Sequence, residues 1–314
     1  MTEYIATRDA YGQELLALGA ENPRIVALDA DLSGSTKTSL FARAYPERFF
    51  NMGIAEQDMM GFAAGLAAGG LIPFASTFAV FAAGRALEPI RNTIAYPRLN
   101  VKIAASHAGL SVGEDGASHQ ALEDVAWLRA VPHMTVLVPA DAVETRLAVR
   151  AAATEPGPFY LRLGRPATPV LFGPDYRFAV GRMNVLREGR DLTIVANGLM
   201  LAPALRAAEI LAAEGLTAAV LNGSSVKPFD AETLLHWAAR TGAVVTAEEH
   251  SIVGGLGSAA AEILAEGCPV PLARVGIRDS FGESGEPEAL LAKYGLTAEG
   301  VAAAARSAAA RKLK

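Results

Sequence analysis

The sequence is poor in cysteine, in long apolar runs and in surplus positive charge. Its one cysteine, Cys268, excludes an internal disulfide bond, and no run of apolar residues reaches the roughly 18 that a membrane-spanning helix needs. Acidic residues outnumber basic ones by 33 to 28, so net charge gives no general attraction to nucleic acid or anionic lipid. The start of the chain also lacks the basic and apolar segments of a signal peptide. We therefore expect a soluble protein of the cytoplasm.

The 314 residues suffice for two domains, each with its own core. Short apolar segments alternate with alanine-rich segments of helical length, which predicts parallel sheets covered by helices. Strands are predicted at 24–30, 72–76, 101–105, 135–138 and 159–163, then at 192–196, 217–221, 244–247 and 272–275; helices are predicted at 55–69, 78–95 and 142–153, then at 201–214, 231–241, 255–265 and 286–294. The prediction is an α/β protein with two domains, each a mainly parallel sheet with flanking helices. The first domain is placed at 1–168, a linker at 169–188 and the second domain at 189–314.

One glutamate, Glu56, stands just before an apolar helical run. Its neighbours Ile54, Met59 and Phe62 should partly desolvate the carboxyl group, which favours a group that holds and returns a proton near neutrality. The alternative is an ordinary glutamate at a helix N-terminus, stabilised by the helix dipole. The segment by itself leaves both interpretations open.

Titratable and aromatic residues gather in the following hundred residues. His107 and His119 flank a glycine-rich loop that contains Asp115, and loops of this kind often carry function. A metal site is the competing interpretation, but no further ligand stands at a recognisable spacing, so we predict no metal bound by this chain. Phe78 and Phe81, three residues apart at the predicted start of a helix, can present both rings on one face. Plain core packing is the alternative for this pair.

Taken in order, these motifs resemble the transketolase family, over residues 7–309. The matching parts are the pyrimidine-binding domain and the C-terminal domain of these thiamine diphosphate enzymes. The resemblance implies that Glu56 binds the pyrimidine ring of the cofactor and starts the catalytic cycle, and that Phe78 and Phe81 stack on that ring. It places His107 beside the thiazolium and the donor substrate, and Asp115 and His119 at the sugar hydroxyls. The two histidines are expected to move protons.

The resemblance also implies a phosphorylated sugar substrate. Arg8, Ser35, His119 and Arg165 match the phosphate ligands of the family, and a phosphate dianion needs such cations and hydroxyl groups. Arg162 competes with Arg165 for this role, and strand alternation would put the two on opposite faces.

Two features depart from the family pattern or add nothing to it. Gly84 stands where family members carry an aromatic residue, so part of the pyrimidine pocket is expected to be open or filled from elsewhere. The glycine-rich segment 254–258 follows Glu248 but matches neither a P-loop nor GxGxxG, and we interpret it as a strand-to-helix turn. The second domain is expected to contribute subunit contacts and no essential catalytic group.

A further part of the family's cofactor site has no counterpart in the sequence. Full-length members hold the diphosphate and its metal with a Gly-Asp-Gly segment and a later Asn in an additional N-terminal domain. The resemblance therefore implies a separate N-terminal partner subunit that holds the diphosphate through Mg²⁺ or Ca²⁺, in an α2β2 heterotetramer with a shared thiamine diphosphate. The predicted reaction, of the pentose phosphate pathway type, transfers a two-carbon ketol unit from a ketose phosphate to an aldose phosphate.

Three alternatives remain at this stage. Two are other thiamine enzymes, a deoxyxylulose-phosphate synthase and the β subunit of a 2-oxoacid dehydrogenase. The third, from a different class, is a non-catalytic structural or regulatory subunit that keeps the fold.

Overall fold

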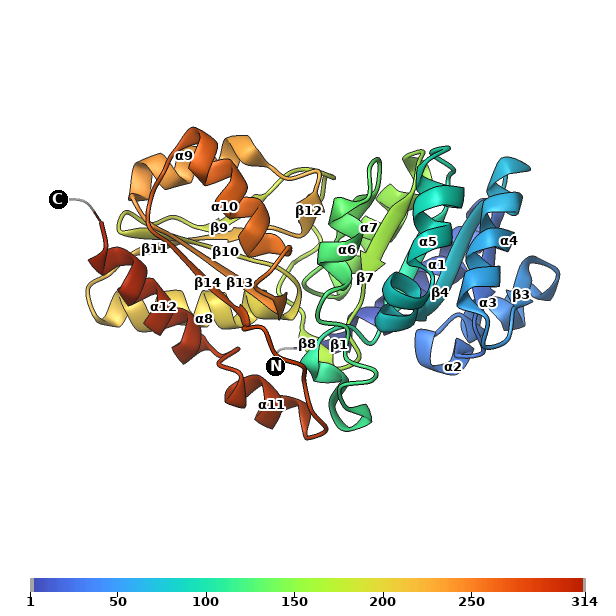
Figure 1. Cartoon of the computed structure of the whole chain (residues 1–314), viewed down its shortest axis with the longest axis horizontal. Coiled ribbons are helices and arrows are strands. Elements are labelled where there is room, and N and C mark those ends of the chain that lie inside the picture. Colours follow the sequence, from blue (N-terminus) through green and yellow to red (C-terminus); the bar gives the residue numbers. More distant parts are fainter. Residues whose placement is uncertain (1–2, 313–314) are drawn as a thin grey trace.

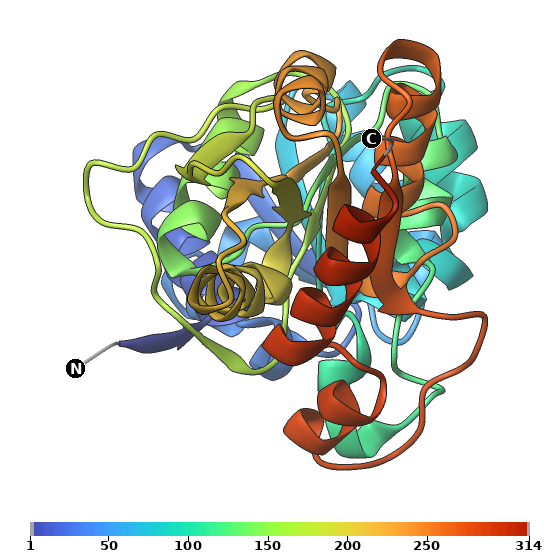
Figure 2. The ribbon, with the colours of Figure 1, turned by 90° about the vertical axis from the view of Figure 1, so that its left-hand side faces the viewer.

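The computed structural model describes residues 3–312 and shows two α/β domains lying side by side (Figure 1). In Figure 2 the second domain faces the viewer and the first lies behind it. The predicted fold class is confirmed, because both main sheets are mostly parallel and carry flanking helices. The outer ends of the predicted domains, residues 1–2 and 313–314, lie outside the described residues.

The first domain is built on a seven-stranded sheet in the order β12-β6-β7-β5-β4-β2-β3. Its strands are β2 (Ile25–Asp29), β3 (Phe49–Asn51), β4 (Ile72–Phe78), β5 (Lys102–Ser106), β6 (Thr135–Leu137), β7 (Phe159–Arg162) and β12 (Ser225–Lys227). All neighbours are parallel except β12 and β6. The central strands are buried on both faces, as uninterrupted apolar strands in a parallel sheet should be.

Helices cover both faces of this sheet. They are α1 (Thr7–Glu21), α2 (Ser33–Thr36), α3 (Ser39–Ala44), α4 (Glu56–Ala68), α5 (Leu87–Pro89), α6 (Asp124–Ala130) and α7 (Ala142–Thr154), with the 3₁₀ turns η1 (Pro46–Arg48) and η4 (Leu110–Asp115) and the π-helical segments η2 (Phe81–Arg85) and η3 (Ile90–Ala95). α1 packs on α7, with Tyr11, Leu15 and Val149 in their shared core. α4 and η3 pack together, in the core that contains Met59 and Ile90.

The second domain holds a five-stranded sheet in the order β14-β13-β10-β11-β9. Its elements are β9 (Asn184–Arg187), β10 (Leu192–Ala196), β11 (Ala218–Asn222), β13 (Val244–Ser251), β14 (Leu272–Ile277), η5 (Gly198–Met200), α8 (Leu201–Ala213), α9 (Ala231–Thr241), α10 (Leu256–Gly267), α11 (Pro287–Lys293) and α12 (Ala298–Ala310). α8 and α12 lie on one face, and α9 and α10 lie on the other (Figure 1). A two-stranded antiparallel sheet joins β1 (Tyr4–Ala6) to β8 (Ala167–Pro169).

The structure corrects the start of the predicted helix 78–95. β4 runs to Phe78, because Thr77 and Phe78 still pair with Ala105 and Ser106 of β5. The chain from Ala79 to Ala95 is helical as predicted, apart from a turn at Ala86, but much of it lies in the two π-helical segments. Phe78 is therefore the last residue of a strand and does not begin a helix.

Strand β12 was not predicted, and it crosses between the halves of the chain. It lies in sequence between strands of the second sheet but pairs antiparallel with β6 of the first sheet. Its Val226 is buried in the first domain's core. A three-residue strand shows no alternation from which its pairing can be predicted. The predicted boundaries at residues 168 and 188 stay a prediction.

Candidate active site

The predicted site residues gather at one edge of the first sheet. β2, β4, β5 and β7 are mutually parallel, so their carboxyl ends meet at the same edge. Ser35 follows β2, Phe78 ends β4, His107 follows β5 and Arg165 follows β7. Ligands of open α/β sheets bind outside this edge, and the topology therefore brings together residues that are far apart in the sequence.

A buried carboxylate begins a series of side-chain contacts along this edge. Glu56, the first residue of α4, is 1% exposed and accepts a hydrogen bond of 2.8 Å at Oε2 from Arg85 Nη1. The Arg85 guanidinium lies over the Phe81 ring, 4.4 Å from its centroid. Glu56 and Arg85 line a surface pocket of about 470 Å³. Ile54, expected to shield Glu56, is 78% exposed, so the burial comes from other neighbours.

Aromatic rings continue the series toward His107. The Phe78 and Phe81 rings are nearly parallel, at 13°, with centroids 6.0 Å apart. Phe78 stacks on the His107 imidazole at 3.8 Å, and the edge of His119 meets Phe81 at 5.4 Å. The predicted presentation of both Phe rings on one side is present, although a strand end and a π-helical segment produce it instead of one regular helix.

His107 is held in an unusual conformation between a hydroxyl group and a guanidinium. Its backbone has φ of +57°, a left-handed value that is costly for a residue with a side chain and is found most often at functional sites. Nε2 lies 3.1 Å from Arg8 Nη1, and Nδ1 lies 2.9 Å from Ser106 Oγ. An arginine N–H can only donate, so Nε2 is the acceptor and Nδ1 holds the proton.

Burial and surrounding cations keep the His107 ring neutral. Desolvation lowers the pKa of His107 to about 3, with further lowering by Arg8, Arg165, His119 and Lys37. The imidazolium form is therefore excluded at neutral pH. Arg8, Arg165 and Lys37 bring positive charge to this pocket, although Lys37 is paired with Asp9 and Arg165 with Glu114 and Asp115; such charge suits an anionic group of a substrate.

The predicted phosphate ligands lie around this pocket. Arg8 donates to the Ser35 backbone carbonyl at 3.2 Å, while its Nε is buried without a hydrogen-bond partner among the described residues. Asp29 fixes the turn before Ser35 by accepting hydrogen bonds from Thr36 Oγ1 at 2.6 Å and the Leu32 amide at 2.5 Å. The orphaned Arg8 donor points to a missing acceptor.

Arg165 and Arg162 lie in different surroundings. Arg165 is half-exposed, with Nη1 3.3 Å from Glu114 and 3.8 Å from Asp115. Arg162 is buried and donates from Nε to Asp124 at 2.8 Å. It ends β7, whereas Arg165 lies beyond the strand, so the predicted alternation does not extend to 165. Their separation comes from burial, and Arg165 is the arginine that the pocket can use.

The space beyond Gly84 is filled by another residue. A side chain added at Gly84 would place its Cβ 3.1 Å from the Trp127 ring, so the indole of α6 occupies the room that a larger residue would need. Among residues 3–312, no group of three or more His, Cys, Asp or Glu side chains is arranged to hold a metal ion. None of the helices in that range is long and apolar enough to cross a lipid bilayer.

Several site residues were not predicted from the sequence. Arg85 binds Glu56, Lys37 forms a 3.1 Å ion pair with Asp9 near Arg8, and Ser106 binds His107. Of these residues, only Arg85 could have been found from the sequence, because it stands four residues after Phe81, a spacing that brings two side chains together on a helix. One other prediction agrees with the structure: segment 254–258 is a strand-to-helix turn, in which Glu248 accepts hydrogen bonds from the Leu256 and Gly257 amides at 2.7 and 2.8 Å.

Comparisons with known proteins agree on one family for both domains. The transketolase pyrimidine-binding domain matches residues 3–170, and the transketolase C-terminal domain matches residues 181–301. A putative transketolase C-terminal section of Methanocaldococcus jannaschii is 49% identical over 95% of both chains. A 1-deoxy-D-xylulose-5-phosphate synthase of Thermomicrobium roseum is 42% identical over 94% of this chain but only 47% of its own length. A solved structure described as a split gene transketolase, inactive beta4 tetramer, is 62% identical with a TM-score of 0.93, and it covers 98% of this chain and 100% of its own.

Proposed function

Because the chain belongs to the transketolase family, we propose that it acts as the C-terminal subunit of a split transketolase and, with a separate N-terminal chain, transfers a two-carbon ketol unit from a ketose phosphate to an aldose phosphate. One observation carries this proposal. Glu56, Phe81, Phe78, His107 and Arg8 form an unbroken series of contacts through Arg85. A buried carboxylate, an apolar ring pair and an electropositive pocket thus lie side by side.

The residues of this chain fit one end of thiamine diphosphate. Bound thiamine diphosphate supplies the electron sink that ketol transfer requires. Glu56 offers a carboxylate, oriented by Arg85, for a hydrogen bond to the pyrimidine ring. Phe78 and Phe81 offer the stacking surface. The diphosphate and its Mg²⁺ or Ca²⁺ are assigned to the partner chain, in an α2β2 assembly in the cytoplasm.

Substrate contacts follow from the pocket around His107. Neutral Nε2 is a hydrogen-bond acceptor, engaged here by Arg8 at 3.1 Å, and its low pKa makes it a weak base for the proton transfer expected of it; it stands beside the site proposed for the cofactor ring. Arg8 and Arg165 provide the positive charge for a sugar phosphate, and the Arg8 Nε–H group, which has no partner among the described residues, can donate a hydrogen bond to it. Asp115 and His119, from the same loop, are proposed to bind the sugar hydroxyls.

The test is reconstitution. The purified chain is mixed with an N-terminal chain that carries Gly-Asp-Gly and a later Asn, thiamine diphosphate and Mg²⁺, and transfer from xylulose phosphate to ribose phosphate is measured. The mixture should be active and each chain separately inactive. Transfer by the isolated chain would contradict the partner requirement; turnover of pyruvate or branched oxoacids instead of sugar phosphates would favour the other thiamine enzymes.

Glu56→Gln tests the role of the carboxylate in the mixture. It should lower kcat by roughly a hundredfold or more, as loss of a general acid–base group does. Glu14→Gln is a matched control, because Glu14 is also a buried carboxylate paired with a half-exposed arginine, Arg150 at 2.5 Å. Equal rates for Glu56→Gln and wild type would support the non-catalytic subunit.

A further inference from the structure

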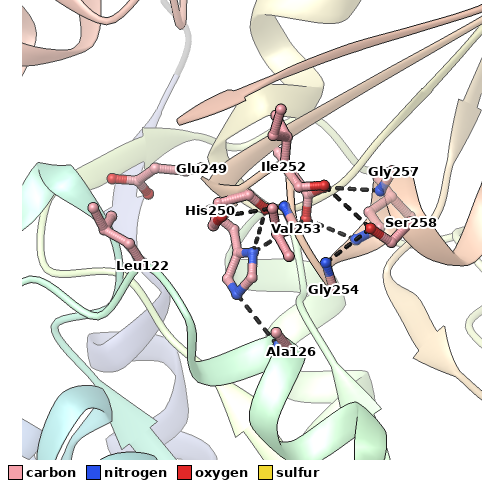
Figure 3. A network of polar contacts seen from close by, with 12 residues as sticks. Leu122, Ala126, Glu249, His250, Ile252, Val253, Gly254, Gly257 and Ser258 are labelled. Atoms are coloured by element: carbon pink, nitrogen blue, oxygen red, sulfur yellow. Dashed lines mark hydrogen bonds and ion pairs between the residues drawn. The ribbon is translucent and has the colours of Figure 1, made fainter. Parts of the chain in front are cut away.

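The second domain reaches the active-site loop with a buried carboxylate. Glu249 lies on β13 and is 6% exposed, and its Oε1 accepts a 2.6 Å hydrogen bond from the Ser111 amide in the segment between His107 and His119. In Figure 3 its side chain points away from the ring of its neighbour His250, which accepts at Nε2 from the Ala126 amide at 3.3 Å. Neighbouring residues on one strand thus serve two different elements of the first domain.

The loop is shaped around this carboxylate. Gly109 has φ of +83°, and a Cβ at this position would lie 2.2 Å from the Glu249 carboxyl carbon. Only glycine allows the backbone to pass so close. Glu249, Ser111 and Arg162 also line a small cavity of about 20 Å³, which is room for one water molecule.

The rest of the loop is also tied to the second domain. Gln120 donates to the Glu283 backbone carbonyl at 2.8 Å, and Ser284 donates to the Glu114 carbonyl at 2.6 Å. These contacts lie at the far end of the loop, whereas the Glu249 contact is four residues from His107. Leu110 also packs in the second domain's core, and among the described residues Glu249 is the second-domain side chain whose hydrogen bond lies nearest to His107.

We propose that Glu249 is a positioning residue for the active site: its carboxylate holds the Ser111 amide and thereby fixes the loop that carries His107, Asp115 and His119. The inference rests on the proposed function, because the loop matters for catalysis only if these residues contact substrate. It also gives the second domain a part in the reaction, where subunit contact alone was predicted.

The strength of this anchor should depend on pH. Burial raises the pKa of Glu249 to about 7, against the opposing effects of Arg162 and the Ser111 amide. The charged and titratable groups around it are Arg162 and Tyr160 on β7, Asp124 on α6, and Glu248 and His250 on β13. Above about pH 7 the ionised carboxylate makes a charge-assisted bond to Ser111; below it the neutral acid is a weaker acceptor.

The first test compares Glu249→Gln with Glu248→Gln in the reconstituted enzyme. Glutamine is neutral and of similar shape, so Glu249→Gln should lower kcat above pH 7 by roughly tenfold and abolish the activity step near pH 7. Glu248 is the matched control, because it is equally buried on the same strand but binds only second-domain amides. A wild-type pH profile in Glu249→Gln, or the same change in Glu248→Gln, overturns the proposal.

The second test needs no catalysis. Amide hydrogen exchange in residues 108–112 of the isolated chain should be roughly tenfold faster in Glu249→Gln, and also in Glu249→Asp, which withdraws the carboxylate by one methylene. Glu248→Gln should leave this exchange unchanged. Unchanged exchange in both Glu249 variants refutes the anchor. If wild-type chains fail to transfer a ketol unit, the proposed function fails, and exchange still decides whether Glu249 holds the loop.

Discussion

Burial separates two arginines that stand three residues apart. Arg162 is 6% exposed and satisfies Asp124, the Ala121 carbonyl and the Glu249 carbonyl. Asp124 also accepts from Tyr160 at 2.6 Å, and the nearby charge of Arg162 lowers its pKa despite burial. Arg165 keeps part of its guanidinium in solvent. A charge that is buried and paired supports the fold, whereas a half-exposed one remains available to a ligand.

Changing each arginine to methionine should therefore affect a different property: stability for Arg162 and substrate binding for Arg165. Arg162→Met leaves a buried carboxylate unpaired and should lower the free energy of unfolding by about 3–5 kcal/mol. Arg165→Met should change it by less than about 1 kcal/mol but raise KM for the phosphorylated donor at least tenfold. Urea unfolding of the isolated chain and steady-state kinetics of the assembly measure the two effects. Equal destabilisation by both changes would contradict this assignment.

At the scale of elements, the π-helical segment after β4 positions the ring pair. Phe78 is the last residue of β4, and a π-helical turn begins at Phe81 and places its ring parallel to that of Phe78. The same turn ends at Arg85, which donates a hydrogen bond to Glu56. π-Helical turns are rare and often lie at functional sites. The packing of Trp127 against Gly84 explains why a small residue stands in this turn.

A bulky residue at 84 should force that turn apart. Gly84→Phe brings a ring against the indole and should cost about 1–3 kcal/mol of stability by overpacking. Adding Trp127→Ala should recover part of the loss, so the double mutant should be more stable than the sum of the single changes predicts. Thermal unfolding of the four proteins tests this. Strict additivity would show that residue 84 does not meet the indole.

At the scale of the whole molecule, the two domains are in contact, and one strand from the second half of the chain belongs to the first domain's sheet. β12 completes the first sheet from within the second half of the chain, with Val226 in the first core. Lys227 donates to the Arg129 carbonyl at 2.9 Å, and Arg129 pairs with Glu262 of α10. The buried junction around Asp124 and Glu249 adds further bonds. Because of these contacts we expect the two cores to unfold as one cooperative unit.

The two tryptophans allow this cooperativity to be measured. Trp127 lies in α6 of the first domain and Trp237 in α9 of the second, so Trp127→Phe and Trp237→Phe each leave a reporter in one domain. Urea unfolding followed by fluorescence should give the same midpoint for both reporters. Val226→Ala, introduced into both, should lower both midpoints by the same amount. Separate midpoints would show that the domains unfold independently.

Much of the fold, and most of the residues proposed for the site, can be predicted from the sequence. Apolar periodicity predicts the central strands and long helices, because burial in a parallel sheet demands uninterrupted apolar runs. Family motifs pick out Glu56, Phe78, His107 and Arg165, which the structure places along one sheet edge. These residues can be named from the sequence because each belongs to a short motif of neighbouring residues.

What the sequence alone determined is thus the α/β class and the family, and it supplied the site residues that are proposed above. Only the tertiary structure decided the pairing of β12, the turn that holds Phe81, the partners Arg85 and Glu249, and the different fates of Arg162 and Arg165. The physical reason is distance along the sequence: apolar periodicity and secondary-structure propensity depend on a few neighbouring residues. A contact between residues 111 and 249 depends on how whole elements pack, and no local pattern records it.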